Sequence, residues 1–374
     1  RMTALADATP VDAAPREPVD EAAEAGRREI GRRARQARRS LLHSGWTRAL
    51  GVGVALAVLL VVVACSIAFG SKSIPFGEVW RGLVDNDGSN DHLIVRSLRV
   101  PRTLLGLGVG VALGLAGALM QGVTRNPLAD PGLLGVDAGA ALAVVIAIHS
   151  FGVTTLGGYV WFAFVGAGLA SMVVYLLGSL GRGGATPVKL ALAGAALTAL
   201  LTSLTSAVLL LDVQTLDVFR FWVVGSLAGR DSEVVAEVWP FLAVGTVLAL
   251  ASARSLNTLS LGDDVARSLG QRVHVARGIS ALSIVVLCGA ATAAAGPIAF
   301  VGLTIPHVAR AICGPDYRWI LTWSLVLAPT LLLSADVIGR VIARPGEVQV
   351  GIVTAFLGAP FFIALVRRRK LADL

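Results

Sequence analysis

Charged side chains are scarce in this sequence: Asp, Glu, Lys and Arg together make up 15% of its 374 residues. Those present cluster between long apolar runs, and hydrophobic residues account for 55% of the chain. A mean hydropathy of +0.75 is far above that of a soluble domain of this length. The composition therefore excludes an ordinary water-soluble protein and predicts one that crosses a membrane many times.

Cysteine is equally rare, and the three residues Cys65, Cys288 and Cys313 are widely spaced within or beside apolar runs. Their spacing matches no metal-binding pattern and no disulfide framework. We interpret them as small packing residues. The run V-V-A-C that ends at Cys65 loosely resembles a lipoprotein cleavage box. Cleavage there is disfavoured, because the preceding region is far longer than the charged start of a signal peptide.

Motifs of catalysis are absent from the sequence, which has no H-E-x-x-H, no G-x-S-x-G and no G-x-x-x-x-G-K-[ST] phosphate loop. The five histidines are scattered, and His149 and His307 have no obvious ligand companion. We therefore expect no catalytic residue, no metal and no cofactor. Any ATP hydrolysis that drives this protein must come from a separate subunit.

Carboxylates inside apolar spans, which mark ion-coupled transporters, are nearly missing. Only Asp137 and Asp336 qualify, both toward span ends, and no chain of carboxylates accompanies them. Asp336 precedes Arg340 by four residues, the helical spacing of an ion pair. An ion-coupled secondary transporter remains the second hypothesis. A structural or signalling membrane protein is a third, disfavoured by the broken spans described below.

The sequence does contain many apolar runs, most of them near the ~20 residues that cross a ~30 Å hydrocarbon core as a helix. We predict ten spans, at residues 46–69, 103–123, 133–151, 156–178, 187–211, 237–254, 275–294, 297–312, 319–341 and 348–367. Several are rich in Gly and Ala, which lets helices approach closely. The expected fold class is an all-α integral membrane protein whose transmembrane domain occupies residues 46–374.

Basic residues mark both ends of the chain. Residues 1–45 read as a cytoplasmic tail that is disordered at first and then basic, and the chain closes on R-R-R-K at residues 367–370. Cytoplasmic segments are enriched in Lys and Arg, so both termini are expected in the cytoplasm, in agreement with an even number of spans. This rule also accounts for the net charge of +8, so we expect lipid contacts but no nucleic acid.

An irregular stretch interrupts the apolar pattern after the second span. The pairs Asn126-Pro127 and Asp130-Pro131 follow about twenty uncharged residues and break the helix. Irregular backbone survives at membrane depth only where protein buries it or where it lines a water-filled path. The stretch therefore predicts a hinge beside a conduit.

Four motifs in unbroken order carry a resemblance to a known family: R-V-P-R-T, M-Q-G-V-T-R-N-P-L-A-D-P-G-L-L-G-V, A-G-P-I-A-F-V-G-L-T-I-P-H-V-A-R and G-I-V-T-A-F-L-G-A-P-F-F. Over residues 99–369 the chain resembles the FecCD/BtuC-type permeases, membrane subunits of ABC importers for iron-siderophore complexes, haem and cobalamin. The resemblance implies a type II ABC importer permease fold in a bacterial cytoplasmic membrane. It also implies three kinds of partner: a second permease subunit, identical or paralogous, two ATP-binding cassette subunits, and an extracytoplasmic substrate-binding protein. Iron-siderophore is the substrate class expected.

The inward loop at about 255–275 is the expected contact with the ATPase. Asp263 and Asp264 before V-A-R-S-L predict a capped short helix with acidic residues at its positive end, and Gly270 predicts its stop. A solvated loop without a partner is the alternative. In the resembled family two short helices at this place couple the permease to the ATPase. The contacts implied are Ala266, Arg267, Ser268, Leu269 and Gly270.

The resemblance also implies a gate and a docking rim. The inner gate of the translocation path falls at Asn126, Leu128 and Thr186, although Asn126-Pro127 can equally be a simple helix-ending turn. At the outer span ends we expect exposed arginines, a rim that includes Arg96 and Arg344. In the family, binding-protein carboxylates dock on arginines that match Arg99, Arg102 and Arg340. Contact with lipid phosphate is the alternative for the rim.

Overall fold

The computed structural model describes residues 41–368 except 43, 86, 154 and 181–185, so nearly all of the predicted tail at 1–45 lies outside the described residues. Within the described part every regular element is a helix. The transmembrane elements of the first half are α2 (Gly45–Ala68), α5 (Val100–Thr124), α6 (Val136–Phe151), α7 (Leu156–Ser179) and α8 (Pro187–Leu211). Those of the second half are α10 (Ser232–Ala251), α13 (Val273–Ala295), α14 (Val301–Cys313), α15 (Tyr317–Ile342) and α16 (Val350–Arg368).

Shorter elements connect these helices. They are α3 (Phe76–Val84), α4 (Asn90–Leu93), a π-helical turn η1 (Ile94–Arg99), the 3-10 turn η2 (Pro131–Leu134), α9 (Val213–Val223), α11 (Ala253–Leu259) and α12 (Asp263–Ser268). Seven described helices are long and apolar enough to cross a membrane, and α6, α14 and α16 are shorter apolar helices. The all-helical fold is confirmed, and these helices together occupy the ten predicted runs.

The bundle is organised around α5. Pro101 fits its first turn, where a missing N–H costs little, and the helix ends at Arg125 in the left-handed conformation. Helices α10, α13, α14 and α15 surround α5, and 83% of its most apolar stretch is buried. Close approach requires small residues: a Cβ on Gly117 would lie 1.9 Å from the carbonyl oxygen of Gly302 in α14.

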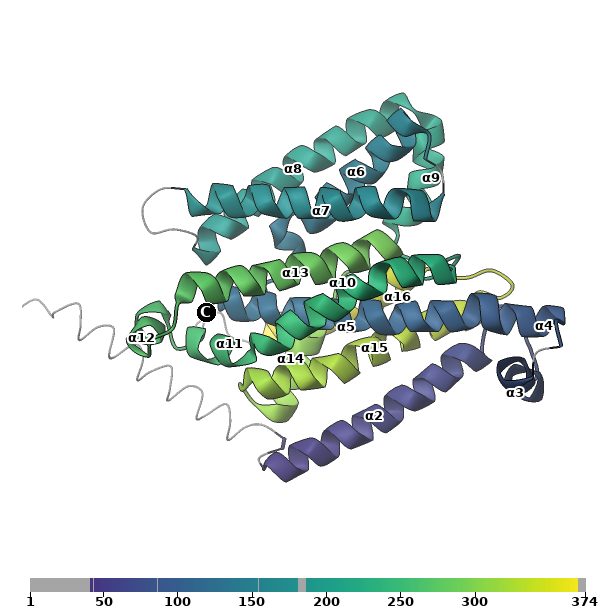
Figure 1. The fold of residues 1–374 in the computed structure, drawn as a ribbon, viewed down its shortest axis with the longest axis horizontal. Coiled ribbons are helices and arrows are strands. Elements are labelled where there is room, and N and C mark those ends of the chain that lie inside the picture. Colours follow the sequence, from purple (N-terminus) through teal and green to yellow (C-terminus); the bar gives the residue numbers. More distant parts are fainter. Residues whose placement is uncertain (1–40, 43, 86, 154, 181–185, 369–374) are drawn as a thin grey trace, which may run out of the picture.

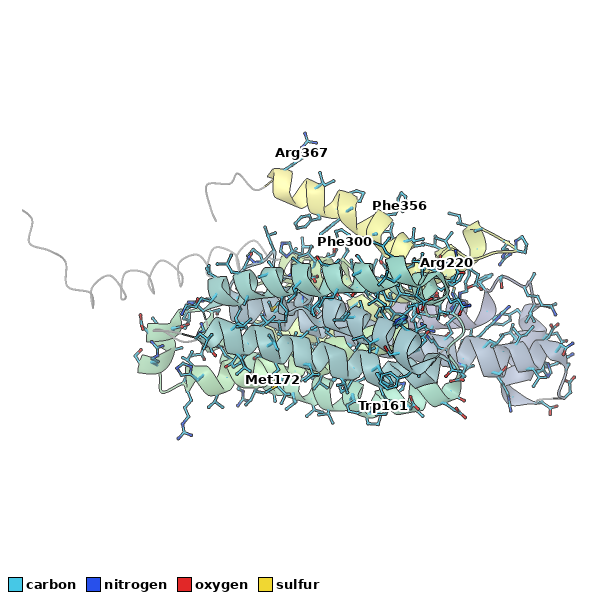
Figure 2. All side chains as sticks on the ribbon, turned by 90° about the horizontal axis from the view of Figure 1, so that it is seen from above. Trp161, Met172, Arg220, Phe300, Phe356 and Arg367 are labelled. Atoms are coloured by element: carbon cyan, nitrogen blue, oxygen red, sulfur yellow. The ribbon has the colours of Figure 1, made fainter. Side chains whose placement is uncertain are left out.

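The remaining helices flank this centre (Figure 1). Helices α6, α7, α8 and α9 form a group on one side of α13, and α2 packs on α15 at the other. The short helices α11 and α12 lie at one end of the bundle, and α3 and α4 lie at the opposite end. Figure 2 shows α16 at one edge, where it carries Phe356, while Trp161 and Met172 of α7 lie along the opposite edge.

Two predicted spans begin later than the apolar pattern indicates. The run at 133–151 is divided into η2 and α6, which meet at Gly135 with φ of +72°. The run at 297–312 becomes helical only at Val301, after Phe300 with φ of +70°. Both helices are therefore shorter than a full span. Irregular backbone precedes each of them, as expected where it is buried among other helices.

Candidate functional site

The predicted hinge is a hydrogen-bonded turn at the end of α5. Arg125 adopts φ of +52°, a conformation that few residues other than glycine take up. The Asn126 side-chain oxygen then accepts the N–H of Leu128 at 2.9 Å, which closes an Asx turn. The Asp130 carboxylate accepts the N–H of Gly132 at 2.8 Å at the start of η2. Burial raises the pKa of Asp130, and this hydrogen bond partly offsets the effect.

Thr186, the third predicted gate residue, caps α8. Its hydroxyl oxygen accepts the N–H of Lys189 at 3.3 Å. Helix α8 packs on η2 so closely that a Cβ on Gly194 would clash with the carbonyl of Leu133. The described contacts include no direct bond from Thr186 to Asn126 or Leu128. The structure thus brings α8 and the hinge segment together as elements, without joining the three side chains in one cluster.

The inward loop contains the short helix that the sequence predicts. Helix α12 begins at Asp263, and Gly270, with φ of +79°, follows its end. The expected side-chain cap is wrong: Gly262 is the N-cap, and no side chain bonds there. The Asp263 side chain forms ion pairs with other residues instead of capping the helix, and the sequence does not indicate these pairs. Its carboxylate lies 2.9 Å from Arg277 of α13 and 3.2 Å from Arg125 at the hinge.

Four of the five predicted coupling residues are exposed on α12 and the turn after it, namely Arg267, Ser268, Leu269 and Gly270. Leu269 is 64% exposed, so its side chain is accessible to a partner. The expectation for Ala266 is wrong, because its exposed fraction is 0%. Ala266 packs into the bundle and cannot touch another subunit directly.

The outer arginines differ from expectation. Arg99 is only 4% exposed, and its guanidinium donates hydrogen bonds to the carbonyls of Ile67, Ala68 and Lys72. Arg340 is 1% exposed and donates at 2.9 Å to the carbonyls of Ser66 and Phe69. The two side chains therefore satisfy the end of α2, where helix carbonyls lack partners.

Arg102 completes this buried network. Its guanidinium lies 2.7 Å from a carboxylate oxygen of Asp336 and 2.7 Å from Glu347. Asp336 also pairs with Arg340 at 2.9 Å, so the predicted i,i+4 ion pair is confirmed. The expectation that Arg99, Arg102 and Arg340 form an exposed rim is wrong, because carbonyls and carboxylates of the chain itself occupy their guanidinium groups. Of the other two arginines predicted for the rim, Arg96 and Arg344, both are exposed, and Arg96 donates hydrogen bonds to the carbonyls of Gly82 and Leu83.

The histidine singled out at the end of α6 also has a structural partner. His149 Nδ1 lies 2.8 Å from the carboxylate of Asp212, which caps α9. The Thr215 hydroxyl donates to the same carboxylate at 2.6 Å. These two hydrogen bonds, that from Thr215 first, hold the pKa of Asp212 well below its usual range. The contact joins α6 to the junction of α8 and α9.

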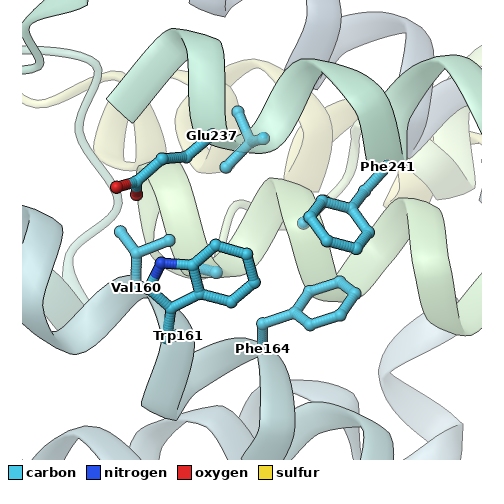
Figure 3. A pocket seen from close by; sticks show the side chains of 8 residues that line it. Val160, Trp161, Phe164, Glu237 and Phe241 are labelled. Carbon is cyan, nitrogen blue, oxygen red and sulfur yellow. The ribbon is translucent and has the colours of Figure 1, made fainter. Parts of the chain in front are cut away.

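A small cavity lies between α7, α10 and α13 (Figure 3). Its volume is about 10 Å³, and Trp161, Phe164, Glu237 and Phe241 contribute to its lining. Such a space holds a single water-sized group and is far too small for a metal chelate. Glu237 is the first residue of the predicted span at 237–254 and is therefore an acidic residue at a span end, in addition to Asp137 and Asp336.

The sequence has close relatives among known transport proteins. It is 49% identical over 323 residues to the ferric enterobactin transport system permease protein FepD of Escherichia coli, covering 86% of this chain and 96% of that protein. It is 42% identical over 317 residues to the iron(3+)-hydroxamate import system permease protein FhuB of Bacillus subtilis (84% and 82%). The hemin transport system permease protein HmuU of Yersinia pestis is 37% identical over 323 residues (84% and 95%).

Solved structures agree in fold. An inward-facing structure of a metal-chelate type ABC transporter superposes with a TM-score of 0.74 at 27% identity, covering 85% of this chain and 99% of that one. The PsaBC structure from Streptococcus pneumoniae, at 15% identity and a TM-score of 0.51, shares the fold over 71% of this chain and 89% of that chain. The model of the FecCD transport family matches residues 58–368. The chain therefore belongs to the FecCD transport family and is a transmembrane permease subunit of an ABC importer.

Proposed function

We propose that this permease imports iron-siderophore complexes, with haem and cobalamin as the alternative chelates. The observation that carries the proposal is 49% identity to the ferric enterobactin permease over 96% of that relative's length. The iron-hydroxamate and hemin relatives support ferric chelates as the broader class.

The structure lends no support to an ion-coupled transporter. Asp336 is fully engaged by Arg102 and Arg340. Asp137 accepts a hydrogen bond from the Thr292 hydroxyl at 2.8 Å. Both intramembrane carboxylates named by the sequence therefore have structural partners, and a transported ion would have to displace them.

The proposed assembly contains a second permease, identical or paralogous, and two separate ATP-binding cassette subunits that hydrolyse ATP. An extracytoplasmic binding protein delivers the chelate. The chain lies in the bacterial cytoplasmic membrane with both termini inside, so that α11 and α12 face the cytoplasm. Four residues of α12 and its following turn, Arg267, Ser268, Leu269 and Gly270, seat on the ATPase.

Transport by this chain is a change of access without covalent chemistry. Closure of the ATPases moves α12, and the motion switches which end of the path is open. The hinge residues Asn126 and Leu128, together with Thr186 at the start of α8, form the inner gate. The Asx turn at Asn126 supports this role, since a small local turn of the backbone can absorb a change of direction.

Docking of the binding protein at the outer end needs a revised account. Direct capture of its carboxylates by Arg99 or Arg340 would require release of the α2 carbonyls that both side chains hold. We propose that the exposed Arg344 meets the binding protein, while Arg102 orders the same loop through Glu347.

Uptake by proteoliposomes tests the function. The permease is reconstituted with its ATPase and binding protein, and ATP-dependent accumulation is compared for an iron-loaded siderophore, haemin and cobalamin. We expect the siderophore complex to accumulate and the other two to be taken up weakly. Accumulation driven by a proton gradient without ATP would overturn the importer mechanism, and preferential uptake of haemin or cobalamin would overturn the substrate class alone.

A further inference from the structure

A basic depression lies at the end of the bundle that carries α11 and α12. Its volume is about 460 Å³, and it is lined by two short stretches of chain: Leu250, Ala251, Ala253 and Arg254 on one side, and Arg318 and Thr322 on the other. The first stretch joins the end of α10 to α11, and the second belongs to the first turns of α15. The depression therefore lies between the end of α10, the start of α11 and the start of α15.

The lining combines basic and uncharged residues. On one wall Leu250 belongs to the last turn of α10 and Arg254 to the first turn of α11, after the break at Ser252. On the other wall Arg318 lies in the first turn of α15, and Thr322 lies about one turn further along that helix. Trp319 of α15 is adjacent, and tryptophan is enriched at the membrane interface.

In the described part of the chain, no carboxylate pairs with either of the two guanidinium groups. Among the described residues neither Arg254 nor Arg318 is part of an ion pair, and both side chains are exposed. The nearest carboxylate in sequence, Asp316, accepts hydrogen bonds from the Asn257 side chain and from the Arg318 backbone N–H. It caps α15 and does not line the depression.

We propose that this depression binds the phosphate headgroup of an anionic membrane lipid, with Arg254 and Arg318 gripping the phosphate from two helices. Guanidinium groups bind phosphate in a bidentate manner, and basic pockets between transmembrane helices hold anionic lipid headgroups. A volume of about 460 Å³ accommodates a phosphoglycerol headgroup. The apolar Leu250 in the same lining would contact the start of the acyl chains of that lipid.

The site has a position relevant to transport. Arg254 belongs to α11, which packs against both α5 and α12. A lipid held there restrains the segment between the central helix and the proposed ATPase contact. The binding of lipid itself does not depend on the proposed function, and only the assignment to the cytoplasmic leaflet rests on the proposed orientation.

Lipid titration of the purified importer complex tests the site. Thermal stability is followed in detergent as phosphatidylglycerol, phosphatidylcholine or inorganic phosphate is added. For the wild type we expect phosphatidylglycerol to stabilise the complex and the other two to have little effect. The double variant R254Q/R318Q should need an about tenfold or higher concentration of phosphatidylglycerol for the same stabilisation.

Arg272 supplies the matched control, because it is an exposed arginine of the same end that does not line the depression. R272Q should respond to phosphatidylglycerol as the wild type does. Equal stabilisation by inorganic phosphate would overturn the lipid proposal in favour of a free anion. An unchanged lipid response in R254Q/R318Q would also overturn it, and loss of the ATPase subunits from that variant would show that the arginines bind protein instead.

Discussion

The guanidinium of Arg102 and the carboxylate of Asp336, 234 residues apart in sequence, form a two-pronged ion pair between the first turn of α5 and the carboxyl-terminal part of α15. Asp336 is 1% exposed and also serves Arg340. Removing its charge by D336N leaves two buried cations with too little compensation, at a cost of about 3–5 kcal/mol.

D336N should therefore lower the melting temperature of the purified permease strongly, as measured by thermal unfolding in detergent. R344Q is the control, since Arg344 is exposed at the same end of the molecule and should melt like the wild type. Equal melting of D336N and the wild type would show that the network is not needed for stability.

Reversing the charge of the exposed Arg344 should affect docking of the binding protein without affecting the stability of the permease. R344E should slow association of the binding protein roughly fivefold, because charges at the rim of an interface act mainly on the association rate. The effect should shrink as ionic strength rises. Surface plasmon resonance across salt concentrations measures both. R99E, by contrast, should lower the melting temperature, because its side chain is buried against α2.

A charge on the exposed leucine of α12 tests the ATPase contact. L269D places an unpaired carboxylate in an interface that excludes water, which costs several kcal/mol of association, on the order of 3 kcal/mol. Co-purification of the ATPase and substrate-stimulated hydrolysis should both fall. The melting temperature of the isolated permease should not change, since Leu269 is exposed in it. Full uptake and stimulated ATPase activity in L269D would remove α12 from the coupling role.

Asp263 links the same helix to the hinge through Arg125 and to α13 through Arg277. D263N should reduce substrate transported per ATP hydrolysed by about fivefold, the low end of coupling between two sites. The ATPase should remain bound. Because Leu128 belongs to the proposed gate, Leu128→Cys residues of two paired permeases should form a disulfide whose yield depends on nucleotide, and D263N should remove that dependence.

The neighbouring Asp264 is the matched control for that variant. Its carboxylate pairs with Arg267 within the exposed turn and makes no contact to the hinge. D264N should retain the transport ratio and the nucleotide-dependent crosslink of the wild type. Identical behaviour of D263N and D264N would show that the ion pairs of Asp263 do not transmit motion.

Substitution of Gly117 probes the contact between α5 and α14. A Cβ there would overlap the Gly302 carbonyl, so G117A forces the helices apart at a cost of about 3 kcal/mol or more. Gly278 of α13 has no atom within 4 Å of a Cβ built on it, so G278A should be neutral. The yield of folded, monodisperse protein compares the two variants, and equal yields would contradict the tight contact.

Hydropathy located the spans well, because a helix that crosses a membrane must itself be apolar in composition. The hinge and the stop at Gly270 were also predictable, since proline and glycine act locally. Helix α9 was missed because Asp217 and Arg220 interrupt its apolar residues.

The environment of the arginines was beyond sequence reasoning. In the sequence Arg99 and Arg340 look like exposed cations at span ends. In the structure their partners are backbone carbonyls at the end of α2, and such partners cannot be recognised from residue types. The burial of Ala266 is likewise set by how α12 lies on its neighbours. At these positions the sequence shows the chemical character of each side chain but does not show which distant residues it contacts.

The attachment of α2 has a consequence for how the protein is made. Only 11% of its apolar stretch is buried, and most of its contacts are made with α15, which also binds its carboxyl end, alongside Arg99, through Arg340. During synthesis that arginine emerges from the ribosome after nearly all other helices. The first helix must therefore wait in the lipid as an independent segment, and ribosome-bound chains that stop before residue 340 should leave it open to chemical labelling from the bilayer.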